Sequence, residues 1–245
     1  MVTTQSGAAD EPSVWAVAMQ QLATAGERIT ALMQERGEPP GNVDAFVALL
    51  GATMDTYLNQ VSADPDFPTF VPCCGYFQHA GSPNPDTVYR RAVIDGAGTY
   101  RITGERGTAR QVTIMPFAAP TGAGMANWSP FDLSDVAAGP RGRFDVLLSP
   151  ERPAGHAGDW WPLEPAMASL WLRTVSDDWG NEPEPRVAIT RVDGARRRAR
   201  PSSEGIEAKL QGHKFRKFGV FLDVRVPVAG VVLAQQVLGE GAIVC

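Results

Sequence analysis

The spacing of apolar residues changes once along this chain, near Asp86, and that change constrains the fold more than any other feature. Before it, apolar residues recur every three or four positions over 11–36 and again over 43–61. After it, short segments rich in β-branched and aromatic residues alternate with a period of two. The first period is typical of amphipathic helices and the second of half-buried strands. The sequence therefore predicts two helices followed by a β-rich region.

Capping residues place the ends of the two helices. Ser13 is a suitable N-cap for the first, and Gly37 with the prolines that follow it ends that helix. Asn42 is a suitable cap for the second. The segment 64–86 then holds five prolines in 23 residues. Because proline breaks helices and restricts the residue before it, this segment is expected to cross the molecule in extended form.

Six segments beyond Asp86 have the composition of strands, and glycine- or proline-containing turns separate them. They are 88–94, 99–104, 111–117, 143–148, 169–175 and 186–192. We expect an α+β fold in which an N-terminal helical hairpin packs on an antiparallel, jelly-roll-like β-sandwich. The expected domains are 1–63, 64–195 and 196–245, with a short helix over 203–212 capped by Ser203. The apolar tail 218–245 is either a packed final element or the stump of a longer chain.

Composition narrows the class of protein. Apolar residues make up 44% of the 245 and charged residues 20%, with a net charge of −5, so neither nucleic acid nor an anionic membrane is an expected partner. The first ten residues lack a signal-peptide pattern, and no apolar run is long enough to span a bilayer. The cysteines Cys73, Cys74 and Cys245 have no disulfide or zinc spacing, which indicates reduced thiols; a reactive or metal-ligating role for Cys73 or Cys74 is the alternative. We expect a cytoplasmic protein.

Familiar cofactor motifs are missing from the sequence. It contains no dinucleotide fingerprint, no phosphate-binding loop, no hydrolase nucleophile elbow and no zinc-protease motif. The three histidines, His79, His156 and His213, lie in separate segments without ligand spacing. We therefore expect no cofactor and no metal. A metal site assembled from scattered histidines and Asp86 is the alternative.

The stiff turn 82–86 delivers polar groups to the start of a strand and is the best candidate site. Pro83 and Pro85 fix the backbone there. Asp86, Tyr89 and His79 are residue types that can act as acid, base and hydrogen-bond donor, and Arg90 could orient a substrate. The alternative is structural: Asp86 caps the turn and Tyr89 packs with its hydroxyl satisfied.

Tryptophans suggest where an apolar ligand could bind. Trp128 lies in the long insertion 118–142, a candidate lid, and Trp160 lies just before a strand. Core packing and a subunit interface are the alternatives for these aromatic residues.

The motif Pro83-Asn84-Pro85-Asp86-Thr87-Val88-Tyr89, followed by Ile94-Asp95 and by Tyr100-Arg101-Ile102-Thr103-Gly104, resembles two bacterial families. These are the domains of unknown function numbered twelve-fourteen and twelve-fifty-four. The later pieces 144–149, 170–173 and 186–189 look similar too, so the likeness covers about 70–193. The resemblance implies a jelly-roll-like sandwich and a homo-oligomer, and it implies no activity. Many relatives carry two such domains, where this chain has one.

Taken together, these features lead to two hypotheses about function. The first is an enzyme that acts on a small, largely apolar molecule by general acid–base chemistry, with Asp86, Tyr89 and His79 as catalytic residues. Arg90, Trp128 and Trp160 would bind its substrate. The second is a non-catalytic ligand-binding or structural β-sandwich that serves assembly.

Overall fold

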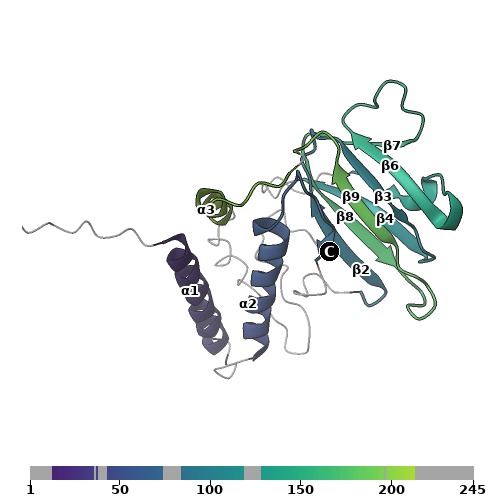
Figure 1. Cartoon of the computed structure of the whole chain (residues 1–245). Coiled ribbons are helices and arrows are strands. Elements are labelled where there is room, and N and C mark those ends of the chain that lie inside the picture. Colours follow the sequence, from purple (N-terminus) through teal and green to yellow (C-terminus); the bar gives the residue numbers. More distant parts are fainter. Residues whose placement is uncertain are drawn as a thin grey trace, which may run out of the picture.

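The computed structural model describes residues 13–35, 37, 43–73, 84–118, 128–195 and 197–212. Two helices come first, α1 (Val14–Glu35) and α2 (Val43–Thr56), and α2 runs directly into a π-helical turn, η1 (Tyr57–Val61). A third helix, α3 (Ser203–Gly212), comes after the strands. Figure 1 shows these helices on one side of a β-rich body. Among the described residues, none of the helices combines the length and the apolar character needed to cross a membrane.

The ends of the helices follow from their capping residues. Ser13 Oγ accepts a hydrogen bond from the Ala16 backbone N–H at 3.2 Å, which satisfies one N–H of the first turn. Gly37 adopts φ +74°, the left-handed conformation that ends many helices. The cap of α3 is Ser202 and not the predicted Ser203, because Ser202 Oγ accepts from the Gly205 N–H at 3.0 Å. The predicted cap Asn42 lies outside the described residues.

Within the described residues, nine strands form two sheets, so the fold is a β-rich sandwich. The first sheet has five strands in the order β1-β2-β8-β4-β5, and the second has four in the order β7-β6-β3-β9. The strands of the first sheet are β1 (Val71–Pro72), β2 (Thr87–Val93), β4 (Gln111–Ala118), β5 (Phe131–Asp132) and β8 (Met167–Val175). Those of the second are β3 (Tyr100–Glu105), β6 (Arg143–Ser149), β7 (Asp159–Pro162) and β9 (Arg186–Arg191).

One strand pair departs from the predicted antiparallel pattern. β6 and β7 are parallel, with Val146 opposite Asp159 and Ser149 opposite Pro162. The connection 150–158 carries the chain back to the starting end of β6 before β7 begins, so both strands run in the same direction. Trp160, which was expected to precede a strand, is therefore itself part of one.

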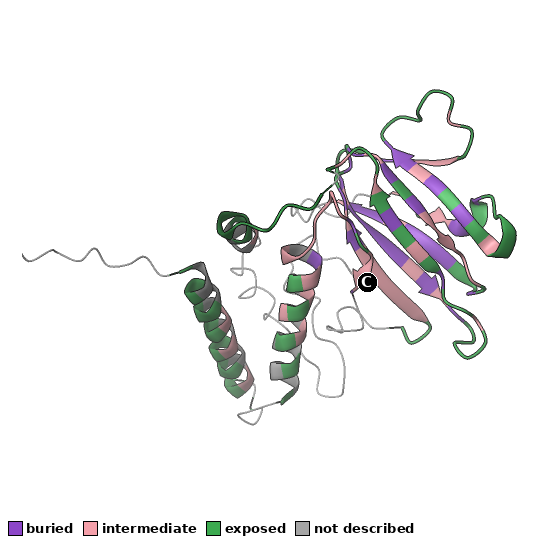
Figure 2. Cartoon of the chain, viewed as in Figure 1, coloured by how far each residue is buried: buried purple, intermediate pink, exposed green. Residues whose placement is uncertain are grey.

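The core lies between the two sheets because alternate residues of each strand point inward. In β6, Phe144, Val146 and Leu148 are buried while Arg143 and Asp145 are exposed. Figure 2 shows this alternation along the strands, whereas the helices are mostly exposed or intermediate. The largest completely buried side chains of the core cluster are Tyr100, Ile102, Ile114, Leu148, Leu170 and Leu172.

Arg191 fastens the segment before β1 to the four-stranded sheet. Its guanidinium pairs with Asp66 at 2.9 Å, with Asp95 at 3.1 Å and with Asp193 at 2.9 Å. The same group lies 5.6 Å from the ring centroid of Tyr100, whose hydroxyl donates to the Pro65 carbonyl at 3.0 Å. These contacts fix the position of the extended chain that leads from η1 to β1.

The C-terminal described segment is attached to the end of η1. Lys209 Nζ donates to the carbonyl oxygens of Val61 and Ala63 at 3.1 and 2.6 Å. Arg198 donates to the Ser62 carbonyl at 2.8 Å and pairs with Asp64 at 3.4 Å. These contacts join residues on both sides of the domain boundaries expected at 63 and 195.

Candidate functional site

The outer face of the five-stranded sheet carries two arginines beside a tryptophan. Leu170 and Leu172 of β8 are buried in the core, so the alternating residues Trp171 and Arg173 belong to the opposite, outward face. Backbone pairing places Trp171 opposite Arg91 of β2.

The neighbouring residues of β2 complete this surface. Ala92 is buried in the core, so Thr87, Tyr89 and Arg91 alternate onto the outward face, with Tyr89 opposite Arg173. We call the five residues Thr87, Tyr89, Arg91, Trp171 and Arg173 the arginine face.

Trp171 is the apolar centre of the arginine face. Only 6% of it is exposed, and its ring centroid lies 4.9 Å from that of Phe117 and 6.5 Å from that of Tyr89. The guanidinium carbon of Arg91 lies 6.0 Å from the Trp171 ring, within cation–π range. Cys73 is buried against the same aromatic cluster. The face therefore combines positive charge with apolar and aromatic contact surface.

Four hydrogen-bonding groups of the arginine face are buried without a partner among the described residues. They are Thr87 Oγ1, Arg91 Nε, Trp171 Nε1 and Arg173 Nε. Neither arginine forms an ion pair with any carboxylate of the described ranges. More than nine in ten buried polar groups in proteins have a partner, so four unpaired groups on one face are unusual. All four groups can donate a hydrogen bond, so each of them lacks an acceptor.

Electrostatics at Arg91 indicate a poorly hydrated positive charge. Burial lowers the pKa of the Arg91 guanidinium, because desolvation disfavours its charged form, while the nearby Asp55 and Cys73 act in the opposite direction. Arginine stays protonated at neutral pH even after such a shift. A charge of this kind favours a bound anion.

A cavity of about 210 Å³ adjoins Arg91, between η1, the segment 62–69 and the strands β1 and β2. Its wall includes the apolar side chains of Leu58, Phe67 and Val93 together with Asn59 and Arg91. Asn59 is 2% exposed, and its Oδ1 has no hydrogen-bond partner in the described part of the chain. Two residues that each carry an unpaired hydrogen-bonding group, Asn59 and Arg91, thus line the same cavity.

The structure places the predicted catalytic group only in part. Asp86 is exposed, and its backbone fixes the turn: its N–H donates to Asn84 Oδ1 at 2.9 Å, and its carbonyl accepts from the Ser176 N–H at 3.0 Å. Tyr89 belongs to the arginine face. His79 lies outside the described residues.

The three predicted substrate-binding residues lie apart from one another. Arg90 follows Tyr89 on β2, so it faces away from the arginine face, and it pairs with Glu184 at 2.5 Å. Trp128 packs against the core cluster. Trp160 lies on β7 of the other sheet, where its indole N–H donates to Ser149 Oγ at 2.9 Å. The structure does not bring these residues together with Tyr89.

Sequence reasoning missed Arg91, Trp171, Arg173 and Asn59. A usable signal was present in the strands: Arg91 of β2 and Arg173 of β8 each stand next to an apolar residue, Ala92 and Leu172, that an alternating strand turns to the opposite face. A strand of this pattern in the middle of a sheet sets a charge on one face and the core on the other. Nothing in the sequence marked Asn59, because its burial depends on tertiary contacts.

No group of three or more histidine, cysteine or carboxylate side chains that could hold a metal ion occurs within the described residues. His156, named in the metal alternative, contacts the backbone carbonyl of Asp159 through Nε2 at 3.1 Å. His79 and His213 lie outside the described ranges.

Comparison with known proteins gives a fold and no activity. No family model matches the chain, and no curated protein matches it. A solved structure of a putative uncharacterized protein from Burkholderia cenocepacia is similar, with a TM-score of 0.68 and 24% identity. The match covers 84% of this chain and 56% of that one, so this chain spans just over half of its neighbour's length.

A protein from Vibrio parahaemolyticus matches more distantly, with a TM-score of 0.35 and 12% identity over 77% of this chain and 58% of that one.

Proposed function

We propose that this chain binds a small organic anion with an apolar body on the arginine face. The observation that carries the proposal is the set of four buried, unpaired groups on Thr87, Arg91, Trp171 and Arg173. A carboxylate or phosphate group offers several acceptor atoms in one place and would satisfy these donors. The two arginines would then hold the anionic end of the ligand.

The surroundings of the two arginines support an apolar remainder for that ligand. Arg91 and Arg173 stand diagonally across β2 and β8, with Cα atoms roughly 7–8 Å apart as in other antiparallel pairs. Trp171 and Tyr89 stand on the other diagonal, in edge contact with each other, and make the surroundings of the two arginines aromatic. The cavity next to Arg91 adds apolar walls from Leu58, Phe67 and Val93. Pockets of this composition are typical of small-molecule sites.

We propose separately that the bound anion is a substrate for acid–base catalysis. Tyr89 is the member of the predicted catalytic group on the arginine face, and its hydroxyl would donate to a bound substrate. Asp86, at the exposed start of β2, and His79 stay predictions for the roles of acid and base. Binding is the better supported activity, because arginine holds anions well and rarely acts as an acid or base.

Isothermal titration with phenylacetate, an aromatic carboxylate, tests the proposal. We expect saturable binding of phenylacetate and none of benzyl alcohol, which has a similar ring but no charge. Replacing Arg91 or Arg173 with methionine should weaken phenylacetate binding about tenfold or more, because a hydrogen bond to a charged group contributes about 1.5–3 kcal/mol.

Arg101→Met is the matched control, because Arg101 is paired and exposed on the other sheet. It should leave the affinity unchanged. The proposal would be refuted if Arg101→Met weakened phenylacetate binding as much as Arg91→Met does. It would also be refuted if the protein bound benzyl alcohol as tightly as phenylacetate.

Assembly through α2 and the first residue of η1 is a second candidate function. Val43, Val47, Leu50, Met54 and Tyr57 are all exposed, by 46–69%, and recur at intervals of three or four residues. The seven-residue spacing of Val43, Leu50 and Tyr57 is typical of a seam between two helices. We propose a second copy of this chain as the partner, so that the protein is a homo-oligomer. Light scattering should show a dimer or larger species that Leu50→Glu dissociates; a monomeric parent protein would overturn this.

Three broader features belong to the same proposal. We propose that α1 and α2 form a hairpin packed on the sandwich, and that the sandwich is jelly-roll-like, since the chain passes repeatedly from one sheet to the other. We propose a cytoplasmic location from the cysteine usage. The relationship to the two families of unknown function is likewise a proposal based on the motif around Asp86.

A further inference from the structure

Asn59 has a buried side-chain amide whose nitrogen has hydrogen-bond acceptors and whose oxygen has no donor among the described residues. Its Nδ2 donates to Asp55 Oδ1 at 2.9 Å and lies 3.5 Å from the Pro72 carbonyl oxygen. Its Oδ1 is buried, unpaired within the described residues, and part of a residue that lines the cavity beside Arg91. Because the amide nitrogen is held by protein acceptors, the oxygen is the end left for another molecule.

A π-helical turn produces this arrangement. Asn59 is the middle residue of η1, where the Ser62 N–H donates to the Tyr57 carbonyl at 2.8 Å, five residues back. Such turns are rare and occur often at functional sites, since they displace side chains from the positions of a regular helix. Asn59 also remains four residues from Asp55, within reach of its carboxylate.

We propose that Asn59 determines ligand specificity by accepting a hydrogen bond from a hydroxyl or N–H group of the bound anion. The inference rests on the proposed function and extends it: the ligand carries a hydrogen-bond donor close to its anionic group, as in a 2-hydroxy acid. The observation that supports this is that Arg91 and Asn59, which carry a buried unpaired donor and a buried unpaired acceptor, line the same cavity.

A ligand with only an acceptor would leave Asn59 Oδ1 buried without a partner. Sites built to hydrogen-bond a substrate group reject analogues that lack it, because the unpaired protein group keeps its desolvation penalty. The protein should therefore distinguish a hydroxy acid from the same acid without its hydroxyl.

Mandelate and phenylacetate differ by one hydroxyl group and make a matched pair of probes. Titration of the full chain with each enantiomer of mandelate and with phenylacetate should give at least one enantiomer that binds about tenfold more tightly than phenylacetate. Asn59→Leu should reduce that ratio to about one while phenylacetate binds within about threefold of its parent affinity. Ser62→Ala, a change on the same cavity wall, should preserve the ratio.

The possible outcomes separate this inference from the function on which it rests. If the parent protein binds all probes equally and Arg91→Met abolishes binding, the role of Asn59 is refuted and the anion site stands. If Asn59→Leu retains the preference, the role of Asn59 is refuted as well. If the parent binds none of the probes, the anion site itself fails. The ratio in the parent protein decides the matter even if Asn59→Leu does not fold.

Discussion

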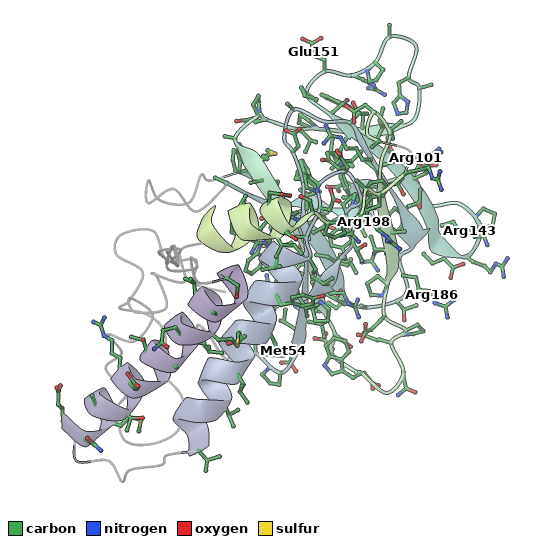
Figure 3. The ribbon with its side chains drawn as sticks, turned by 60° about the vertical axis from the view of Figure 1, so that its left-hand side comes forward. Met54, Arg101, Arg143, Glu151, Arg186 and Arg198 are labelled. Carbon is green, nitrogen blue, oxygen red and sulfur yellow. The ribbon has the colours of Figure 1, made fainter. Side chains whose placement is uncertain are left out.

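The two outer faces of the sandwich both carry arginines, yet their arginines have opposite surroundings. On the four-stranded sheet, Arg101 pairs with Asp145, while Arg143 and Arg186 reach Glu105 at 3.5 and 4.0 Å. Figure 3 shows Arg101, Arg143 and Arg186 projecting on the side of the sandwich away from the helices.

On the five-stranded sheet, by contrast, Arg91 and Arg173 form no direct ion pair among the described residues, and their Nε atoms are buried without a hydrogen-bond partner, although Asp55 is close enough to act on the pKa of Arg91. A paired and hydrated arginine needs no ligand, whereas a buried and unpaired one costs the fold free energy. The absence of an ion pair therefore marks the candidate site better than residue type or cavity size does. The larger hollow, about 780 Å³, lies over the four-stranded sheet, and Glu105, Arg143 and Asp145 along it already have partners.

The largest effect on stability should come from an arginine that is both shielded and fully paired. Arg191 has 14% of its side chain exposed and contacts three carboxylates. Burial acts to lower its pKa, but hydrogen bonds to Asp193 and Asp95 outweigh burial and raise it above the usual arginine value. Arg191→Met should lower the free energy of unfolding by about 2 kcal/mol, since it leaves three carboxylates together without their cation. Urea denaturation measures this loss.

Arg186→Met is the control for Arg191, because Arg186 is 87% exposed at its side chain and makes only a 4.0 Å contact. It should change stability by less than about 0.5 kcal/mol. Equal stability of Arg191→Met and Arg186→Met would show that ion pairing does not distinguish Arg191 from Arg186.

Replacing Arg91 on the arginine face should change stability less than replacing Arg191 does, and in the opposite direction. In the absence of ligand, Arg91→Met should raise the free energy of unfolding by about 1 kcal/mol, because it replaces a desolvated charge, which has no direct ion pair among the described residues, with an apolar chain of similar length. Thermal denaturation of the unliganded variant measures the gain. A loss of stability of the size expected for Arg191→Met would mean that Arg91 is a structural residue.

The smallest effect concerns the exposed pair of Arg101 and Asp145. The hydrogen bond from Arg101 lowers the pKa of the Asp145 carboxyl below its ordinary value. The pair therefore stabilises the fold above the ordinary aspartate pKa of about 3.9, and that contribution is lost as the pH falls through the lower folded value. Asp145→Asn should cost at most about 0.5 kcal/mol at pH 7 and nothing once the pH is well below 4. A larger loss of stability in Asp145→Asn, or a loss that increases as the pH falls, would contradict this prediction.

Much of the sheet could be predicted from sequence because it depends on local pattern. Each of the six segments expected as strands overlaps a strand of the structure, from β2 to β9, since alternating burial leaves a direct trace in the residues. The short strands β1, β5 and β7 were not expected. Each has two to four residues, and β7 pairs in parallel with β6, so only tertiary contacts define them.

The candidate site was predictable only in part, because its members come from elements far apart in the sequence. The motif around Asp86 pointed to β2 and so to Tyr89, one residue of the arginine face. Arg173 reaches that face through pairing of β2 with β8, and Asn59 reaches the neighbouring cavity through η1. Arg90 was predicted to bind substrate instead of Arg91. The correct choice depends on which alternate residues of β2 face the core, and the sequence motif does not show this.

Anion binding by Arg91 and Arg173 can be tested by NMR at the arginine side chains themselves. The Nε–Hε resonances, assigned with single Arg→Met variants, would be followed during titration with phenylacetate and then with benzyl alcohol. We predict that the resonances of Arg91 and Arg173 shift and saturate together with phenylacetate, while those of Arg101 and Arg143 stay in place and benzyl alcohol has no effect. Unchanged Arg91 and Arg173 resonances, or equal shifts at all four arginines, would contradict the claim.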